Sequence, residues 1–190
     1  PGGSCLSSRE FIVTEEIPGR VDLGAGLNPE DFTVVSIFGE TTPAPGTGEF
    51  TLRLPADRLA VIGAVPKGPG ENCFLALRLP EEAVAPRGAS AARAQAGALV
   101  IDAESTAYAL IFMHPFLITA DRTRARALLG TMEPLPAVQN LIGVIGQRYP
   151  LGANGLDDPQ VEAAWGLAVA AVMGALPAGT VFDANQAAAP

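Results

Sequence analysis

Three residues in the middle of the chain carry the chemical groups of a hydrolytic triad. Asp102, Ser105 and His114 supply a carboxylate, a hydroxyl and an imidazole, which can together activate a serine for nucleophilic attack. The sequence around Ser105 lacks the Gly-x-Ser-x-Gly turn that exposes such a nucleophile. His114, the only histidine, stands between Met113 and Pro115 in the most apolar stretch of the chain. We therefore expect a structural histidine and no catalytic residue, and a hydrolase that uses His114 is an alternative.

The carboxylates are not arranged for acid–base catalysis or for strong metal binding. Asp102 and Glu104 offer a weak calcium site, but no acidic loop of a dedicated calcium site accompanies them. Two cysteines and one histidine are too few for a Cys/His metal site. We expect no metal and no cofactor. Neighbours on a strand point to opposite faces, which separates the carboxylates of adjacent acidic residues: Glu15 and Glu16, Glu30 and Asp31, Glu81 and Glu82, Asp157 and Asp158.

The overall charge restricts the partners that the protein can bind. The 190 residues include 20 acidic and 12 basic side chains, a net charge of -8, and such a surface repels phosphate groups. Nucleic acid and anionic membranes are therefore not expected as partners. Apolar residues make up 48% of the chain, which excludes a disordered chain. The uncharged run at 163–182 is rich in alanine and contains Pro177, so we expect a buried helix there and no transmembrane span.

Cysteine and lysine usage bear on the origin and the compartment of the protein. Lys67 is the only lysine beside eleven arginines, a bias typical of a GC-rich bacterial genome. Cys5 and Cys73 are an even pair that is compatible with one disulfide in an exported protein. Two unpaired thiols are the alternative, and Gly3-Ser4-Cys5 also loosely matches a lipid-attachment motif. We favour the disulfide.

Residues 19–102 are expected to form an antiparallel β-sandwich. At 48–54 apolar and polar residues alternate strictly, the pattern of a strand with one buried face. Segments rich in proline, glycine or alanine at 41–47 and 81–97 are predicted to be loops. Further strands are predicted at 20–23, 33–38, 59–65, 73–79 and 99–101.

Residues 103–180 are expected to form a bundle of about four short helices that packs against the sandwich. Beyond residue 104 the apolar spacing becomes helical, as at Val138, Leu141 and Ile145. The predicted helices lie at 107–113, 122–132, 137–149 and 161–176, and the predicted N-caps are Ser105 or Thr106, Asp121 and Asp157. Residues 1–18 and 181–190 are expected to flank the two halves. The predicted fold class is α+β.

Four segments of the strand-rich half share a pattern with a known family: Gly19-Arg20-Val21-Asp22, Phe32-Thr33-Val34-Val35-Ser36, Gly46-Thr47-Gly48-Glu49-Phe50-Thr51-Leu52 and Phe74-Leu75-Ala76-Leu77. Together they resemble the carboxypeptidase regulatory-like domain, a transthyretin-like sandwich marked by a Gly-x-Phe step from turn to strand. The segment from Glu104 to Pro115 resembles the second half of uncharacterised exported bacterial proteins that append helices to such a sandwich. The resemblance implies a location outside the cell or in its envelope, and it implies an accessory role without a reaction.

We therefore expect a non-enzymatic, exported bacterial module that serves assembly, adhesion or scaffolding in the cell envelope. A protein partner or self-assembly is expected, through an apolar patch or sheet edge that could include Val34, Ile37, Val61 and Ile62. The alternatives are a binding module for a small apolar ligand between the sandwich and the helices, and the hydrolase that uses His114.

Overall fold

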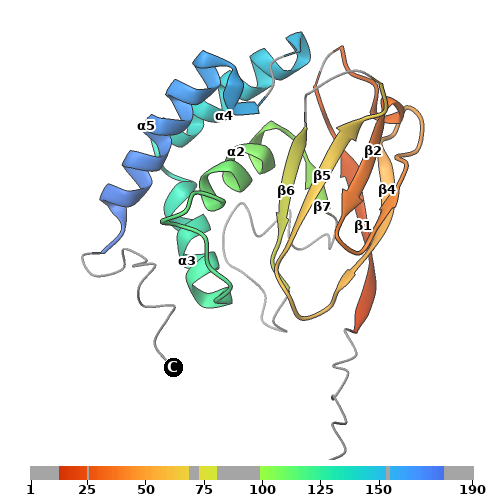
Figure 1. The fold of residues 1–190 in the computed structure, drawn as a ribbon, viewed down its shortest axis with the longest axis horizontal. Coiled ribbons are helices and arrows are strands. Elements are labelled where there is room, and N and C mark those ends of the chain that lie inside the picture. The colour runs from red at the N-terminus through yellow and green to blue at the C-terminus, as the bar shows by residue number, and fades with distance from the viewer. Residues whose placement is uncertain (1–12, 25, 69–72, 81–98, 153–154, 178–190) are drawn as a thin grey trace, which may run out of the picture.

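The computed structural model describes residues 13–24, 26–68, 73–80, 99–152 and 155–177. Over these residues the chain is an α+β protein, with seven strands followed by four α-helices, as the sequence predicts. Figure 1 shows the strands on one side of the molecule and the helices gathered on the other.

The elements follow one another in two runs, first strands and then helices. The strands are β1 (Thr14–Val21), β2 (Phe32–Ser36), β3 (Gly39–Thr41), β4 (Glu49–Pro55), β5 (Ala60–Pro66), β6 (Phe74–Arg78) and β7 (Leu99–Ile101). The α-helices are α2 (Ala103–Phe112), α3 (Arg122–Met132), α4 (Pro136–Arg148) and α5 (Pro159–Ala175). Short 3₁₀ turns are η1 (Pro29–Asp31), η2 (Tyr149–Leu151) and η3 (Gly155–Asp157).

The strands form two sheets, one of three strands in the order β4-β1-β7 and one of four in the order β3-β2-β5-β6. All pairs are antiparallel except β1 with β7, which is parallel. Strand β1 begins at Thr14, inside the segment that was expected to flank the strand-rich half. Its first residues are held by pairing with β4, where Thr14 lies opposite Pro55. Strand β3 was not predicted, because its three residues belong to a turn-rich segment with no alternating pattern.

The alternation of apolar and polar residues in the sequence correctly predicts which face of β4 is buried. In β4 the side chains of Phe50, Leu52 and Leu54 are buried, and the polar residues between them are exposed. In β6 the buried face carries a charge: Arg78 is 9% exposed, donates to the Pro55 carbonyl and pairs with the Glu15 carboxylate. That guanidinium links β6 of one sheet to β4 and β1 of the other.

The backbone conformation at position 48, in the Gly-x-Phe step before β4, requires a glycine. Its φ of +70° lies in the left-handed region, and an added Cβ would stand 2.3 Å from the Val21 carbonyl oxygen. A side chain at position 48 would push the two backbone segments apart, and the hydrogen bond from Val21 N–H to the Gly48 carbonyl at 2.9 Å would be lost. This glycine therefore sets where β4 starts beside β1.

Aspartate side chains cap three of the helices. Asp121 caps α3, as predicted, by accepting from Arg124 N–H. The cap of α2 is Asp102 and not Ser105 or Thr106, because Asp102 accepts from Ser105 N–H while the Ser105 hydroxyl bonds back to Asp102 N–H. The cap of α5 is Asp158 rather than its neighbour Asp157.

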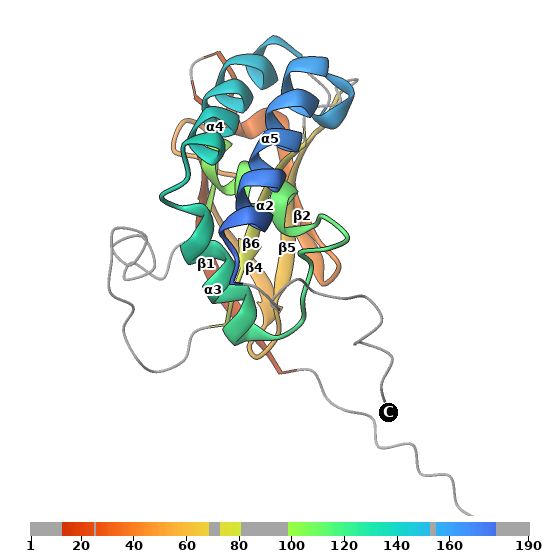
Figure 2. The same ribbon diagram turned by 90° about the vertical axis from the view of Figure 1, so that its left-hand side faces the viewer.

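Helix α2 lies nearest the strands, packed against β6, and it contacts α4 and α5 on its other side. Figure 2 shows α4 and α5 in front of α2, with the strands behind. Phe74 of β6 is fully buried between the two halves, with edge-to-face ring contacts to Phe32 and Tyr149 at 6.1 and 5.1 Å between centroids. Among the described residues no helix is both long and apolar enough to span a membrane. The run at 163–182 contributes to α5, which ends at Ala175.

Candidate binding groove between the two halves

The three residues of the potential triad lie at opposite ends of α2. The Ser105 hydroxyl donates to the Leu75 carbonyl at 2.8 Å and accepts from Asp102 N–H at 2.9 Å. His114 lies two residues beyond the end of α2 at Phe112, and the helix rises by about 10 Å from Ser105 to that end. The structure therefore brings Asp102 and Ser105 together as a helix cap but does not bring His114 to either of them.

His114 instead completes the turn that follows α2. Its Nδ1 accepts from Phe116 N–H at 3.3 Å, and its ring centroid lies 5.4 Å from the rings of Phe116 and Trp165. Trp165 Nε1–H donates to the Leu110 carbonyl at 3.1 Å, which satisfies one of the last carbonyls of α2. The histidine and the tryptophan thus fix the end of α2 against α5.

The potential calcium ligands also have structural partners. The Asp102 carboxylate accepts from Ser105 N–H at 2.7 Å, and the Glu104 carboxylate accepts from the Tyr108 hydroxyl at 3.2 Å. Within the described ranges, no three histidine, cysteine, aspartate or glutamate side chains come close enough together to hold a metal ion.

Cys73 is half-buried beside β5 and forms no disulfide within the described part of the chain. Its expected partner, Cys5, lies outside the described residues, so the pairing stays a prediction. Burial raises the pKa of the Cys73 thiol. Burial, with a smaller contribution from Cys73, also raises the pKa of Tyr149 to about 12, so this tyrosine is a neutral core residue at physiological pH.

The N-terminal end of α2 closes the edge of the four-stranded sheet. Leu75 N–H in the edge strand β6 donates to the Thr106 hydroxyl at 3.0 Å, and the Leu75 carbonyl accepts from the hydroxyls of Ser105 and Thr106. Thr106 itself is fully buried. Side-chain oxygens of a helix thus take the place of a further strand, and the edge is covered at this point.

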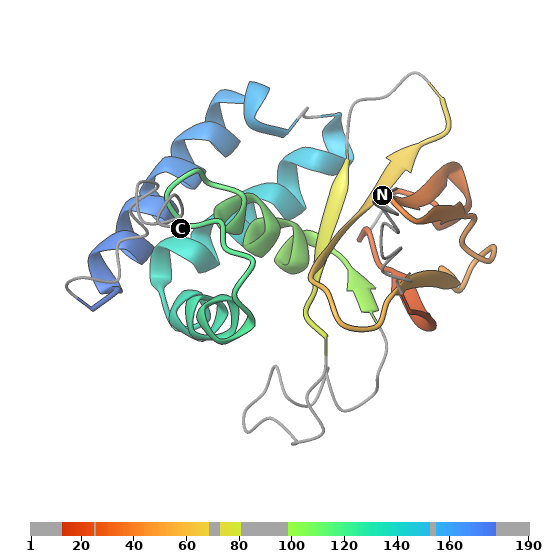
Figure 3. The ribbon, with the colours of Figure 1, turned by 60° about the horizontal axis from the view of Figure 1, so that its bottom comes forward.

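At the C-terminal end of α2 the two halves leave a groove of about 480 Å³. Figure 3 shows the two halves side by side, with the link from α2 to α3 on the helical side of the boundary. We name this hollow the seam groove. Its strand-side lining is Asp57, Arg58, Leu59 and Val61, and its helix-side lining is Phe112, Met113, Ile118, Thr119, Ala120 and Arg122.

Cations and apolar side chains meet in the seam groove. The Arg122 guanidinium donates to the Asp57 carbonyl, and Arg58 lies 3.9 Å from the Asp57 carboxylate. The loop that carries the helix-side lining also exposes large apolar side chains, with Ile118 at 54% and Phe116 at 50% exposure. Exposed apolar side chains that gather beside a hollow can mark an interaction site.

The sequence suggested a ligand site between the two halves only as an alternative and named none of its residues, and the four residues proposed for an apolar patch have separate places. Val34 and Ile62 are fully buried in the core. Val61 lines the seam groove, and Ile37 projects from the turn between β2 and β3 with 90% of its surface exposed. The signal in the sequence was the apolar segment around His114, which Pro115 interrupts.

A second hollow, of about 670 Å³, lies over β1, β4 and the segment after β3. Its lining includes Arg20, Glu49 and three threonines, and its one large apolar side chain, Phe50, is buried beneath it. The seam groove, although smaller, has more large apolar side chains in its lining, as ligand sites usually do.

Comparison with protein-family models, with curated proteins and with solved structures gives no match for this chain.

Proposed function

We propose that the chain is a non-enzymatic, exported bacterial module for assembly, adhesion or scaffolding in the cell envelope, and that the seam groove is its contact surface. One observation carries this proposal: the groove is lined by Ile118, which is 54% exposed, and the same loop exposes Phe116 at 50%. Apolar side chains that gather around a hollow are typical of protein interaction sites.

We further infer that the two sheets form the transthyretin-like sandwich that the sequence resemblance implies. Buried side chains of both sheets belong to one hydrophobic cluster, among them Val34 and Ile62 of one sheet and Leu52 and Leu54 of the other. Strand β3 also contacts β4, and β6 contacts β7, as the neighbouring edges of two packed sheets do. On this inference the strand-rich half is the support that carries the contact surface.

The absence of a catalytic role is supported by the separation of Ser105 from His114. Both side chains are engaged in fixing the two ends of α2. A hydrolytic turnover that is lost in His114→Ala and kept in a folded Trp165→Phe variant would overturn the non-enzymatic proposal.

Site-specific photocrosslinking tests the contact surface. A benzoyl-phenylalanine replaces Phe116 in one variant and Leu167, 65% exposed on α5, in the control. After irradiation in an extract of the source cells, mass spectrometry identifies the cross-linked polypeptide and the site on it. We expect one defined polypeptide to be captured from position 116 and not from position 167. Equal capture from both positions, or none, would contradict the proposal.

A small apolar ligand in the same groove is the second candidate function. The groove volume of about 480 Å³ lies within the range of about 300–1,000 Å³ for small-molecule sites. Native mass spectrometry of the purified chain tests this candidate. A bound molecule that is lost in the Ile118→Asp variant would favour the ligand-binding function. If the purified chain carries no bound molecule, the protein contact is the remaining candidate.

The exported location is a separate part of the proposal and rests on the resemblance and on the pair Cys5 and Cys73. Alkylation of the unreduced native protein, followed by mass spectrometry, counts the free thiols. A disulfide predicts no alkylated cysteine and a mass that lacks two hydrogens. Alkylation of both residues would remove this support, and an added lipid mass on Cys5 would indicate the lipid anchor instead.

A further inference from the structure

We propose that the occupant of the seam groove is the β2–β3 turn of a second copy of this chain, so that copies join head to tail. This inference rests on the proposed function, because it names the partner of the same contact surface.

The β2–β3 turn has the shape and the chemistry of an insert. Ile37 is the most exposed of the large apolar side chains in the described part of the chain, at 90%. The Ser36 hydroxyl accepts from Phe38 N–H at 3.1 Å, which holds the turn in one conformation. Glu40, also exposed, follows Ile37 by three residues. The turn therefore presents an apolar tip, with the carboxylate of Glu40 on the adjoining strand β3, and little order has to be gained on binding.

The seam groove complements this insert in both respects. Leu59, Val61 and Ile118 offer an apolar lining for Ile37, and Arg122 at the same site offers a cation for Glu40. A guanidinium carries five N–H donors, and the bond to the Asp57 carbonyl uses one of them. The net charge of -8 makes two copies repel each other at most relative orientations, so this local pairing of opposite charges also selects one orientation.

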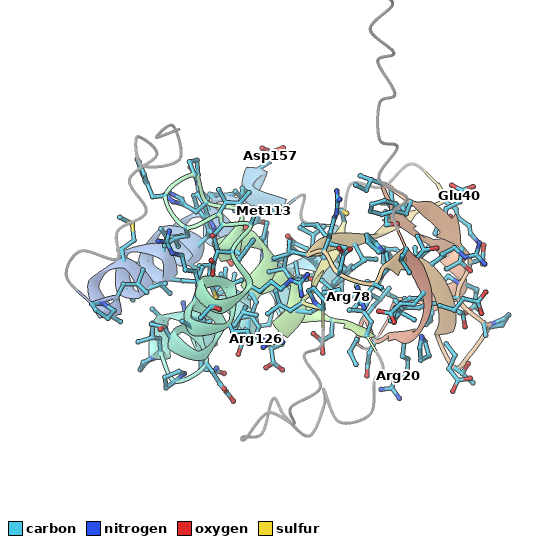
Figure 4. The ribbon with its side chains drawn as sticks, turned by 90° about the horizontal axis from the view of Figure 1, so that it is seen from below. Arg20, Glu40, Arg78, Met113, Arg126 and Asp157 are labelled. Atoms are coloured by element: carbon cyan, nitrogen blue, oxygen red, sulfur yellow. The ribbon has the colours of Figure 1, made fainter. Side chains whose placement is uncertain are left out.

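The two surfaces lie on different parts of the molecule. Figure 4 shows Glu40 at the end of the strand-rich half that is distant from the helices, whereas Met113 lies on the helical side. A turn of one chain therefore meets the groove of another chain. Because the contact joins two different surfaces, each added copy leaves a free turn at one end and a free groove at the other. Such heterologous contacts extend into open chains unless the rotation between copies closes a ring.

Light scattering of the purified protein across concentration tests this contact. We expect the mass of the wild type to grow with concentration, and Ile37→Ser and Ile118→Ser to stay monomeric. Leu167→Ser removes an apolar side chain that is 65% exposed on α5 and should leave the growth of the mass with concentration unchanged. Circular dichroism and thermal unfolding confirm that each variant is folded.

Mixing the two monomeric variants gives the decisive result. Ile37→Ser keeps an intact groove and Ile118→Ser keeps an intact turn, so an equimolar mixture should form dimers and no longer chains. In the same way, Arg122→Glu should abolish the growth of the mass with concentration, and the added substitution Glu40→Arg should restore it. A mixture that stays monomeric while the wild type grows would overturn the proposed pairing of surfaces.

The outcome also separates this inference from the proposed function. A wild type that is monomeric at every concentration would overturn the second copy as occupant. If position 116 then cross-links a different, identified polypeptide, the seam groove is still a contact surface. If position 116 cross-links nothing, both proposals fail.

Discussion

The two ends of α2 meet the strand-rich half in opposite ways. At its N-terminal end, Ser105 and Thr106 bond the backbone of Leu75, and the boundary is closed. At its C-terminal end, the following loop places Ile118 in an open groove and leaves both Ile118 and Phe116 about half exposed to solvent. At the first end, short hydroxyl side chains form hydrogen bonds with the backbone of an edge strand. At the second end, apolar side chains stay exposed, and no other part of the described chain covers them.

This difference teaches where the molecule can accept a partner. A sheet edge whose backbone groups are bonded by a helix offers no template for a further strand, so β6 is blocked at Leu75. The opposite end of the same helix has apolar side chains and Arg122 on its surface, which favour insertion of a side chain rather than strand pairing. The closed end should therefore control stability, and the open end should control association.

The largest effect is expected at the closed end, from Phe74→Ala. Phe74 is 1% exposed and contacts rings of both halves, so its removal leaves a cavity between them. We expect a loss of about 3–5 kcal/mol in the free energy of unfolding, measured by urea denaturation. Far-UV circular dichroism and tryptophan fluorescence should report one shared transition, since Trp165 lies in the helical half. Two separate transitions would show that the halves unfold independently.

A smaller loss is expected from Thr106→Val, which keeps the shape of the side chain and removes its hydroxyl. The half-buried Leu75 N–H then loses its acceptor at 3.0 Å, and because a fully buried unsatisfied donor costs about 1–3 kcal/mol, we expect a loss near the lower end of that range. In a chain of this size the melting temperature should fall by roughly 2–4 °C per kcal/mol. Thr106→Ser restores the hydroxyl and serves as the control. An unchanged melting temperature in Thr106→Val would mean that the edge is not held by this bond.

A pH-dependent effect is expected at Asp158, which caps α5 and links it to α4. The Arg148 guanidinium donates to Asp158 Oδ2 at 2.6 Å, and this bond with the helical N–H groups lowers the pKa of the Asp158 carboxyl. A lowered pKa means that the carboxylate stabilises the fold above the pKa of the unfolded chain. That contribution is lost as the pH falls through the lower pKa of the folded state.

The substitution Asp158→Asn isolates the charge, because asparagine is also a good N-cap. Its melting temperature should lie below that of the wild type at neutral pH, and the difference should shrink as the solution is acidified. Arg148→Gln should show the same trend, since it removes the other half of the pair. A difference that stays constant down to low pH would assign the effect to the cap geometry and not to the charge.

Much of the fold was accessible from local patterns, and the exceptions have physical causes. Strict alternation gave the buried face of β4, and the helical spacing of Val138, Leu141 and Ile145 gave the buried face of α4. The start of β1 at Thr14 was missed, because its Thr-Glu-Glu-Ile-Pro sequence has little strand preference. That segment becomes a strand through its long-range pairing with β4.

The residues that line the seam groove were not predictable, because its two sides come from distant parts of the sequence. Asp57 and Arg122 are 65 residues apart and meet through a side-chain bond to a backbone carbonyl. The sequence around His114 showed an apolar segment with a proline, which is equally consistent with a core. Only the way the chain turns after α2 decides that Phe116 and Ile118 face solvent while Leu117 between them is buried.

The smallest effect on stability is expected at the open end, from Phe116→Ser and Ile118→Ser. Both side chains are about half exposed, and surface substitutions of this kind usually change the free energy of unfolding by no more than about 0.5 kcal/mol. The buried neighbour Leu117, 1% exposed in the same loop, provides the contrast, since Leu117→Ala should cost about 2–5 kcal/mol. Urea denaturation of the three variants measures both values. Large losses at positions 116 and 118 would mean that the loop is part of the core, and the apolar residues there would then need no partner to explain them.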